Sequence, residues 1–258
     1  MADWNEPRRV QQGFGASPRL SGEVAARGTY DMGLRRHMLS IYNYMGSGVL
    51  LTGIVALLTA STGLAISFAS GPLMWIVALS PLAIVFAMSF GQNRFSTSTL
   101  QAMFWGFAVL MGLSLSTIFL VYTGSSIAAT FFATAGAFAG LSLWGYTTKK
   151  DISAWGAFLI MGVVGLIIAT LLNAFLIGSP GLELAISVLG VLIFAGLTAY
   201  DTQRLKNEYL QIQSLKVTNP GVAAAYPTGK MVVMGALSLY LDFINMFLFL
   251  LRFMGNRE

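Results

Sequence analysis

The sequence predicts an all-α membrane protein, a bundle of seven transmembrane helices with a cytoplasmic N-terminus. Of its 258 residues, 56% are hydrophobic and only 10% are charged, whereas a soluble domain usually has about 25% charged residues. No charged residue occurs between residues 38 and 93, and none occurs between Arg94 and Lys149. Because roughly 20 apolar residues cross the hydrocarbon core of a bilayer, each of these runs is long enough for two helices.

Turn signals divide the chain into its predicted helices. Glycine, proline and small polar residues interrupt the charge-free runs at 70–72 and 122–126, and further turns follow at 149–151 and 178–181. The seven predicted helices lie near residues 40–61, 73–91, 99–121, 127–146, 152–177, 182–205 and 231–254. We therefore expect a disordered basic cytoplasmic tail over 1–37, a transmembrane domain over 38–254 and a short C-terminal end over 255–258.

Basic residues in the short loops set the predicted orientation, because the cytoplasmic loops of membrane proteins are enriched in lysine and arginine. The N-terminal flank and alternate loops contain Arg35, Arg36, Arg94, Lys149, Lys150, Arg204, Lys206, Lys216 and Lys230. The intervening loops, 62–72, 122–126 and 178–182, contain none. The N-terminus is therefore predicted to be cytoplasmic and the C-terminus external, although Arg252 and Arg257 do not follow this pattern.

The composition also argues against several functions. Cysteine is absent, so the chain can form no disulfide, thiolate metal site or cysteine nucleophile. The net charge of +5 comes without the aromatic-interleaved basic stripe that would indicate nucleic-acid binding. The N-terminal tail does not have the pattern of a signal peptide, and the single histidine, His37, lies among arginines. We expect a monomeric protein of the bacterial cytoplasmic (inner) membrane that contacts lipid and requires no cofactor.

Two carboxylates interrupt the last two predicted helices. Asp242 lies in the middle of the apolar run 231–254, where a charge costs about 2.5 kcal/mol or more. Asp201 ends the preceding apolar run. Because the two helices are consecutive and antiparallel, we expect both acids in the cytoplasmic half of the bundle, with Asp242 deeper. They are candidates for a single site, to which Asn245, one turn beyond Asp242, could add an oxygen.

Two carboxylates inside a bundle of low dielectric cannot both stay charged without a counter-charge, so the pair would hold either a proton or a cation. Oxygen ligands favour calcium over zinc or copper. The resulting hypothesis is a site at the cytoplasmic mouth of a pore where protons and calcium compete. Two simpler interpretations stay open. Asp201 could pair with Arg204 on its own helix, and Asp242 could be a protonated or interhelix hydrogen-bonded acid.

The residues around these acids resemble one protein family. Residues 234–245, MGALSLYLDFIN, together with LLRF at 250–253, resemble the last-helix signature of the Bax inhibitor-1-like family, also called the transmembrane Bax inhibitor motif family. AYDTQ at 199–203 resembles the penultimate-helix motif of that family, and KKD at 149–151 resembles its loop before the fifth helix. The similarity covers roughly residues 38–254.

This resemblance implies a seven-helix fold in which Asp201 and Asp242 form a pH-sensing pair that gates a calcium leak and contacts the ion. Bacterial relatives are described as having a second-helix arginine that latches to the helix-six aspartate. The nearest candidate for this latch is Arg94, and Arg204 is a rival partner. A helix-two acid of relatives has no counterpart here, because residues 81–88 contain neither aspartate nor glutamate.

Two other functions are weighed against a calcium leak. Intramembrane aspartyl proteases also place Tyr-Asp on one helix and an aspartate on the next, but their second motif is Gly-x-Gly-Asp. Residues 239–242 read Leu-Tyr-Leu-Asp, and bulky residues at both glycine positions argue against an enzyme. The main alternative is a regulator that binds a membrane protease or another membrane protein, as is proposed for some bacterial relatives.

Overall fold

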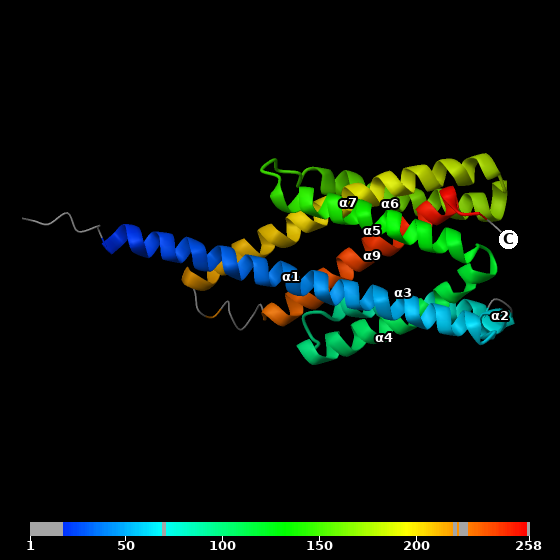
Figure 1. Cartoon of the computed structure of the whole chain (residues 1–258), viewed down its shortest axis with the longest axis horizontal. Coiled ribbons are helices and arrows are strands. Elements are labelled where there is room, and N and C mark those ends of the chain that lie inside the picture. Colours follow the sequence, from blue (N-terminus) through cyan, green and yellow to red (C-terminus); the bar gives the residue numbers. More distant parts are fainter. Residues whose placement is uncertain (1–17, 69–70, 219–220, 222–226, 257–258) are drawn as a thin grey trace, which may run out of the picture.

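The computed structural model describes residues 18–68, 71–218, 221 and 227–256, and over these residues it consists of helices joined by turns, with no β-strand (Figure 1). The α-helices are α1 (Pro18–Ser61), α2 (Leu64–Phe68), α3 (Gly71–Gly91), α4 (Thr97–Leu115), α5 (Gly124–Thr147), α6 (Trp155–Leu172), α7 (Pro180–Thr218) and α9 (Thr228–Met254). A 3₁₀ segment, Ser116–Leu120, extends α4, and a π-helical segment, Asn173–Ile177, extends α6. Among the described residues, seven helices are long and apolar enough to cross a membrane, which confirms the predicted fold class.

Helix α1 begins earlier than predicted. It is continuous from Pro18, whereas the sequence suggested a helix from about residue 40 and a disordered tail over 1–37. Proline is favoured at the first position of a helix, and no further proline lies between Pro18 and Ser61 to interrupt it. The part of α1 that could cross a membrane is Met32–Ser61. Residues 1–17 of the predicted tail lie outside the described residues.

Helix α7 is also longer than predicted, and it ends at Thr218 rather than near residue 205. The extension keeps Leu205, Tyr209 and Ile212 buried. These residues recur every three or four positions, so they fall on one face of the helix and can pack against the bundle beyond the apolar run. The short helix α2 lies in a segment that was predicted as a loop.

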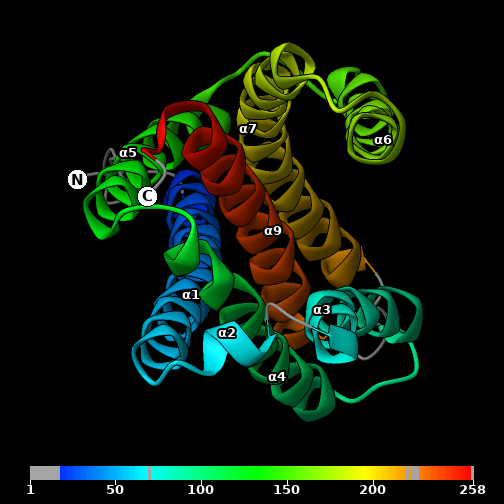
Figure 2. The same ribbon diagram turned by 90° about the vertical axis from the view of Figure 1, so that its right-hand side faces the viewer.

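Helix α9 lies at the centre of the bundle, where α1, α4, α5 and α7 pack around it (Figure 2). In its most apolar stretch 67% of the residues are buried, compared with 11% for α3 and 6% for α6 at the periphery. The helix that contains Asp242 is therefore the one best shielded from lipid. Ionisable residues within membrane spans generally face the protein interior in this way.

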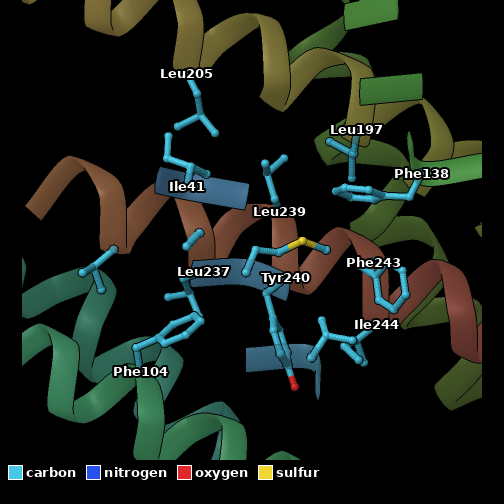
Figure 3. Close-up of a cluster of buried hydrophobic side chains, with 14 of the residues drawn as sticks. Ile41, Phe104, Phe138, Leu197, Leu205, Leu237, Leu239, Tyr240, Phe243 and Ile244 are labelled. Atoms are coloured by element: carbon cyan, nitrogen blue, oxygen red, sulfur yellow. The ribbon is translucent and has the colours of Figure 1, made fainter. Parts of the chain in front are cut away.

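The buried side chain of Tyr240 joins three helices at the core (Figure 3). The hydroxyl of Thr52 on α1 donates its only proton to the carbonyl of Ala108 on α4, at 2.8 Å. The Tyr240 hydroxyl, 2.6 Å from Thr52 Oγ1, must therefore be the donor of that second hydrogen bond. The rings of Phe104 and Phe107 meet the Tyr240 ring edge-on. These contacts fix the rotation of α9 and hence the direction of its neighbouring side chains.

Apart from the end of α9 with Arg252, the helix ends that have basic residues lie at one end of the bundle, which we call the basic end. It comprises the start of α1, the α3–α4 and α5–α6 turns, the end of α7 and the start of α9 (Figure 1). Helix α2, the start of α7 and residue 256 lie at the opposite end. The segregation agrees with the loop pattern from which the sequence predicts a cytoplasmic N-terminus.

Candidate functional site

Asp201 is held by two side chains near the basic end. Its Oδ1 lies 3.3 Å from Nη2 of Arg204, which is three residues further along α7. The hydroxyl of Ser238 on α9 donates to its Oδ2 at 2.5 Å, and Arg204 Nη2 donates to the same Ser238 oxygen at 3.0 Å. The three side chains form a closed triangle that links α7 to α9. The Asp201 side chain is only 8% exposed, whereas that of Arg204 is 44% exposed.

Asp242 lies one helical turn beyond Ser238 on α9 and is 5% exposed. Its Oδ2 is buried and has no hydrogen-bond partner among the described residues. The charges that act on it electrostatically are those of Asp201 and Arg204. The structure therefore brings the two predicted acids close enough to influence each other, although no hydrogen bond joins them directly. A buried carboxyl oxygen without a partner is uncommon in proteins, and such groups often have functional roles.

A polar pocket of about 640 Å³ leads from the basic end to this triangle. It lies between α3, α7 and α9, and both Arg204 and Ser238 are part of its lining. Lys230 spans its outer part by donating to the carbonyl of Gln92 at 3.2 Å. Asp242 does not line the pocket. The pocket therefore gives access to the outer partners of Asp201 and stops short of the deeper acid.

Of the two arginines predicted as possible partners of Asp201, only one pairs with it in the structure. Arg204 pairs with Asp201, whereas Arg94 makes no ion pair with a described residue. Arg94 lies in the tight turn after α3, where its N–H donates to the carbonyl of Gly91 at 2.9 Å. The prediction that Arg94 could latch Asp201 is therefore not met in this arrangement. The ordinary ion pair within α7, left open by the sequence, is the one that forms.

Asn245 does not join the acids. Its amide nitrogen donates to the carbonyl of Leu241, within α9, at 2.8 Å. Although it lies on the same helix one turn from Asp242, it makes no hydrogen bond to either aspartate among the described residues. The predicted role of Asn245 as an additional oxygen ligand stays a prediction.

Sequence reasoning missed the residues that anchor α7 around Asp201. Gln203 Nε2 donates to the carbonyl of Lys150 at 2.8 Å, and Gln203 Oε1 accepts from the N–H of Ile152 at 3.0 Å. The hydroxyls of Thr202 on α7 and Ser142 on α5 lie 2.9 Å apart. The two motifs at 149–151 and 199–203 are thus parts of one interface. Both motifs resemble motifs of the same protein family, which was the only hint in the sequence that they matter. That resemblance did not show that they contact each other.

Helices α5 and α7 approach closely beside the site because residue 145 is glycine. A Cβ atom at Gly145 would collide with the backbone carbonyl of Ala199, two residues before Asp201. Small residues at such points allow two transmembrane backbones to come together. The position of Asp201 is therefore determined by backbone packing on one side and by Arg204 and Ser238 on the other.

The site provides few ligands for a metal ion. Among the described residues, no group of three or more His, Cys, Asp or Glu side chains could hold one. Calcium usually takes six to eight oxygen ligands. Asp201 and Asp242 would supply carboxylates, and Ser238 a hydroxyl, so a calcium ion here would keep much of its water shell. The arrangement fits transient contact with a cation better than tight binding.

Comparison with known proteins decides the family. The family model described as "Inhibitor of apoptosis-promoting Bax1" matches residues 34–258. The chain belongs to the Bax inhibitor-1-like family. This result confirms the resemblance drawn from the motifs around Asp201 and Asp242, and it extends the match to the end of the chain.

Several bacterial members of the Bax inhibitor-1-like family are similar over most of their length. The inner membrane protein YbhL of Escherichia coli strain K12 is 41% identical over 228 residues, which is 88% of this chain and 94% of YbhL. A protein of Caulobacter vibrioides is 46% identical over 239 residues, 88% of this chain and 92% of its own. A protein of Rickettsia prowazekii is 43% identical over 232 residues, which is 89% of this chain and 93% of that protein. Together with the seven apolar helices, this similarity confirms an integral inner-membrane protein.

Proposed function

We propose that this protein is a pH-sensitive calcium leak channel of the inner membrane, gated by Asp201 and Asp242. The observation that carries the proposal is the buried Asp242 oxygen, which has no partner among the described residues and lies near the Asp201–Arg204 ion pair. A carboxyl group in this position is costly within a membrane, and acids inside membrane spans commonly mark ion or proton pathways. The polar pocket ending at Arg204 and Ser238 supplies an entrance.

In the proposed mechanism, Arg204 takes the place of a permeating cation. Its guanidinium neutralises Asp201 while the pathway is closed. Because its side chain is 44% exposed and lines the pocket, it can move outward into the pocket without being buried itself. Displacement of Arg204 would free Asp201 and Ser238 to contact an incoming calcium ion. A site with so few ligands binds weakly enough to release the ion, as conduction requires.

Protons and calcium compete for the same carboxylates in this mechanism. Calcium contacts the ionised form of an aspartate, whereas a protonated carboxyl group has lost the charge that attracts the ion. Acidification should therefore weaken the interaction of calcium with the pair, and a rise in pH should strengthen it. Replacement of either aspartate by asparagine removes the titrating group and with it the pH response.

The test measures calcium flux through the full-length protein in proteoliposomes, from mildly acidic to neutral pH. We expect the flux of the wild type to change with pH and that of Asp201→Asn and Asp242→Asn to lose this dependence. Asp151→Asn is the matched control, because Asp151 lies in the exposed α5–α6 turn. There the hydroxyl and backbone N–H of Ser153 lower the pKa of Asp151, so it stays ionised throughout. An equal pH response in all four proteins would refute the gating pair.

The two alternatives predict different results. A regulator of a membrane protease would bind its partner equally well with either aspartate replaced, and it would show no flux. An aspartyl protease would cleave a helical substrate and lose this activity in both variants. The structure gives proteolysis little support, because Leu239 is fully buried and Leu241 is partly buried where the protease motif has glycines. These bulky side chains leave a substrate backbone less room to approach Asp242 than glycines would.

A further inference from the structure

A groove of about 430 Å³ separates α1 from α5 on the outside of the bundle. Both helices pack against α9, but they do not pack closely against each other (Figure 2). The lining is almost entirely apolar and includes Met38 and Leu39 of α1 and Phe138, Ala139 and Leu143 of α5. The shape and lining of this groove suit a flexible hydrocarbon chain, which the surrounding bilayer supplies.

The groove also has a positive end. Arg35 is part of its lining at the basic end, and Tyr42 and Tyr146 also line the groove. Lys206 reaches toward the same place, since its Nζ donates to the carbonyl of Tyr146 at 2.7 Å and lies 5.7 Å from the centre of that ring. Among the residues whose side chains the structure describes, none that lines the groove is acidic. Its occupant should therefore be apolar along its length and anionic at one end.

We propose that this groove binds an anionic glycerophospholipid, with one acyl chain between α1 and α5 and the phosphate group at Arg35. Basic pockets between transmembrane helices recognise anionic lipid headgroups, and tyrosines favour the headgroup level of the bilayer. The lipid would fill the gap that the two helices leave and so tie α1 to α5. None of the lining residues belongs to the Asp201–Arg204–Ser238 triangle, so the inference does not depend on the proposed leak.

The headgroup part of the proposal is tested by native mass spectrometry of the full-length protein with dioleoylphosphatidylglycerol. We expect wild-type protein to retain this lipid more strongly than dioleoylphosphatidylcholine, which has the same chains and no net charge. Arg35→Gln should weaken retention of the anionic lipid about fivefold, the usual effect of one basic residue near a membrane surface. Arg36→Gln should retain it as the wild type does, because Arg36 is the adjacent, equally exposed arginine but does not line the groove.

The acyl-chain part is tested with a second pair of variants. Ala139→Phe places a ring inside the groove, whereas Ala137→Phe adds the same ring at an exposed position of α5 outside it. We expect weaker lipid retention only for Ala139→Phe. Thermal unfolding in dioleoylphosphatidylcholine should be similar for all four variants, which shows that each has folded.

Three outcomes would overturn this inference. Equal losses in Arg35→Gln and Arg36→Gln would mean that the lipid responds only to surface charge. Equal retention of the two lipids by the wild type would show that the groove does not recognise an anionic headgroup. Full lipid retention by Ala139→Phe would show that the acyl chain does not lie in the groove.

Discussion

At the scale of single residues, the two aspartates have opposite surroundings. Asp201 accepts a hydrogen bond from Ser238 and pairs with Arg204. Asp242 is equally buried, yet its Oδ2 has no partner among the described residues. A buried polar group that is satisfied stabilises the fold, whereas one that is not satisfied destabilises it. The pair therefore combines one acid that supports the structure with one that weakens it.

Replacement of each aspartate by leucine should separate these roles. Asp242→Leu should raise the free energy of unfolding by about 1–2 kcal/mol, because it removes an unsatisfied buried carboxyl group. Asp201→Leu should lower it by about 1–3 kcal/mol, because Arg204 and Ser238 lose their shared acceptor. Chemical denaturation in a fixed detergent measures both values. Destabilisation of similar size in both variants would contradict the assignment of Asp242 as the unsatisfied acid.

At the scale of helices, the close approach of α5 to α7 positions the site. Gly145 lies against the carbonyl of Ala199, and Gln203 anchors the α5–α6 turn to α7. Asp201 lies between these two contacts in the sequence of α7. The distance between α5 and α7 should therefore control both the stability of the bundle and the geometry of the triangle on the opposite side of α7.

Gly145→Ala should push α5 and α7 apart, since the new methyl group would collide with the Ala199 carbonyl. We expect a loss of about 1–3 kcal/mol in the free energy of unfolding, the usual cost of overpacking. Gly140→Ala is the matched control on α5, because no atom of a neighbouring helix lies within 4 Å of the added Cβ. Thermal melting compares the two variants. A loss at position 140 as large as that at 145 would contradict the close-approach explanation.

At the scale of the whole molecule, the loops and helix ends with basic residues lie at one end of the bundle, apart from Arg252 at the end of α9, while α9 runs through its centre. This arrangement places the triangle and its pocket nearer the basic end. In the proposed leak, and with that end cytoplasmic as the sequence predicts, calcium would leave the acid pair through the pocket and enter the cytoplasm.

Reporter fusions at the C-terminus should establish this orientation. With seven spans and a cytoplasmic N-terminus, alkaline phosphatase fused after the last residue should be active, because it is then exported. Green fluorescent protein at the same position should be dark, and at the N-terminus it should be fluorescent. The reverse pattern would show that the basic end faces outward, and the pocket would then open to the exterior.

The sequence by itself determined the seven membrane-spanning helices and the family, and it pointed to Asp201 and Asp242 as candidates for a site. These features depend on the length of apolar runs, the charge of short loops and local motifs, all of which are properties of neighbouring residues. Helix ends were less well determined, because α1 and α7 continue beyond the apolar runs. In α7, one face still packs against the bundle through Leu205, Tyr209 and Ile212.

Only the tertiary structure decided which helix is central and that Arg204 rather than Arg94 pairs with Asp201. It also showed that Oδ2 of Asp242 has no hydrogen-bond partner among the described residues. Each depends on how helices far apart in the sequence rotate and approach one another. That rotation is set by contacts such as that of Tyr240 with Thr52, which join residues far apart in the sequence. A local sequence pattern cannot predict such contacts.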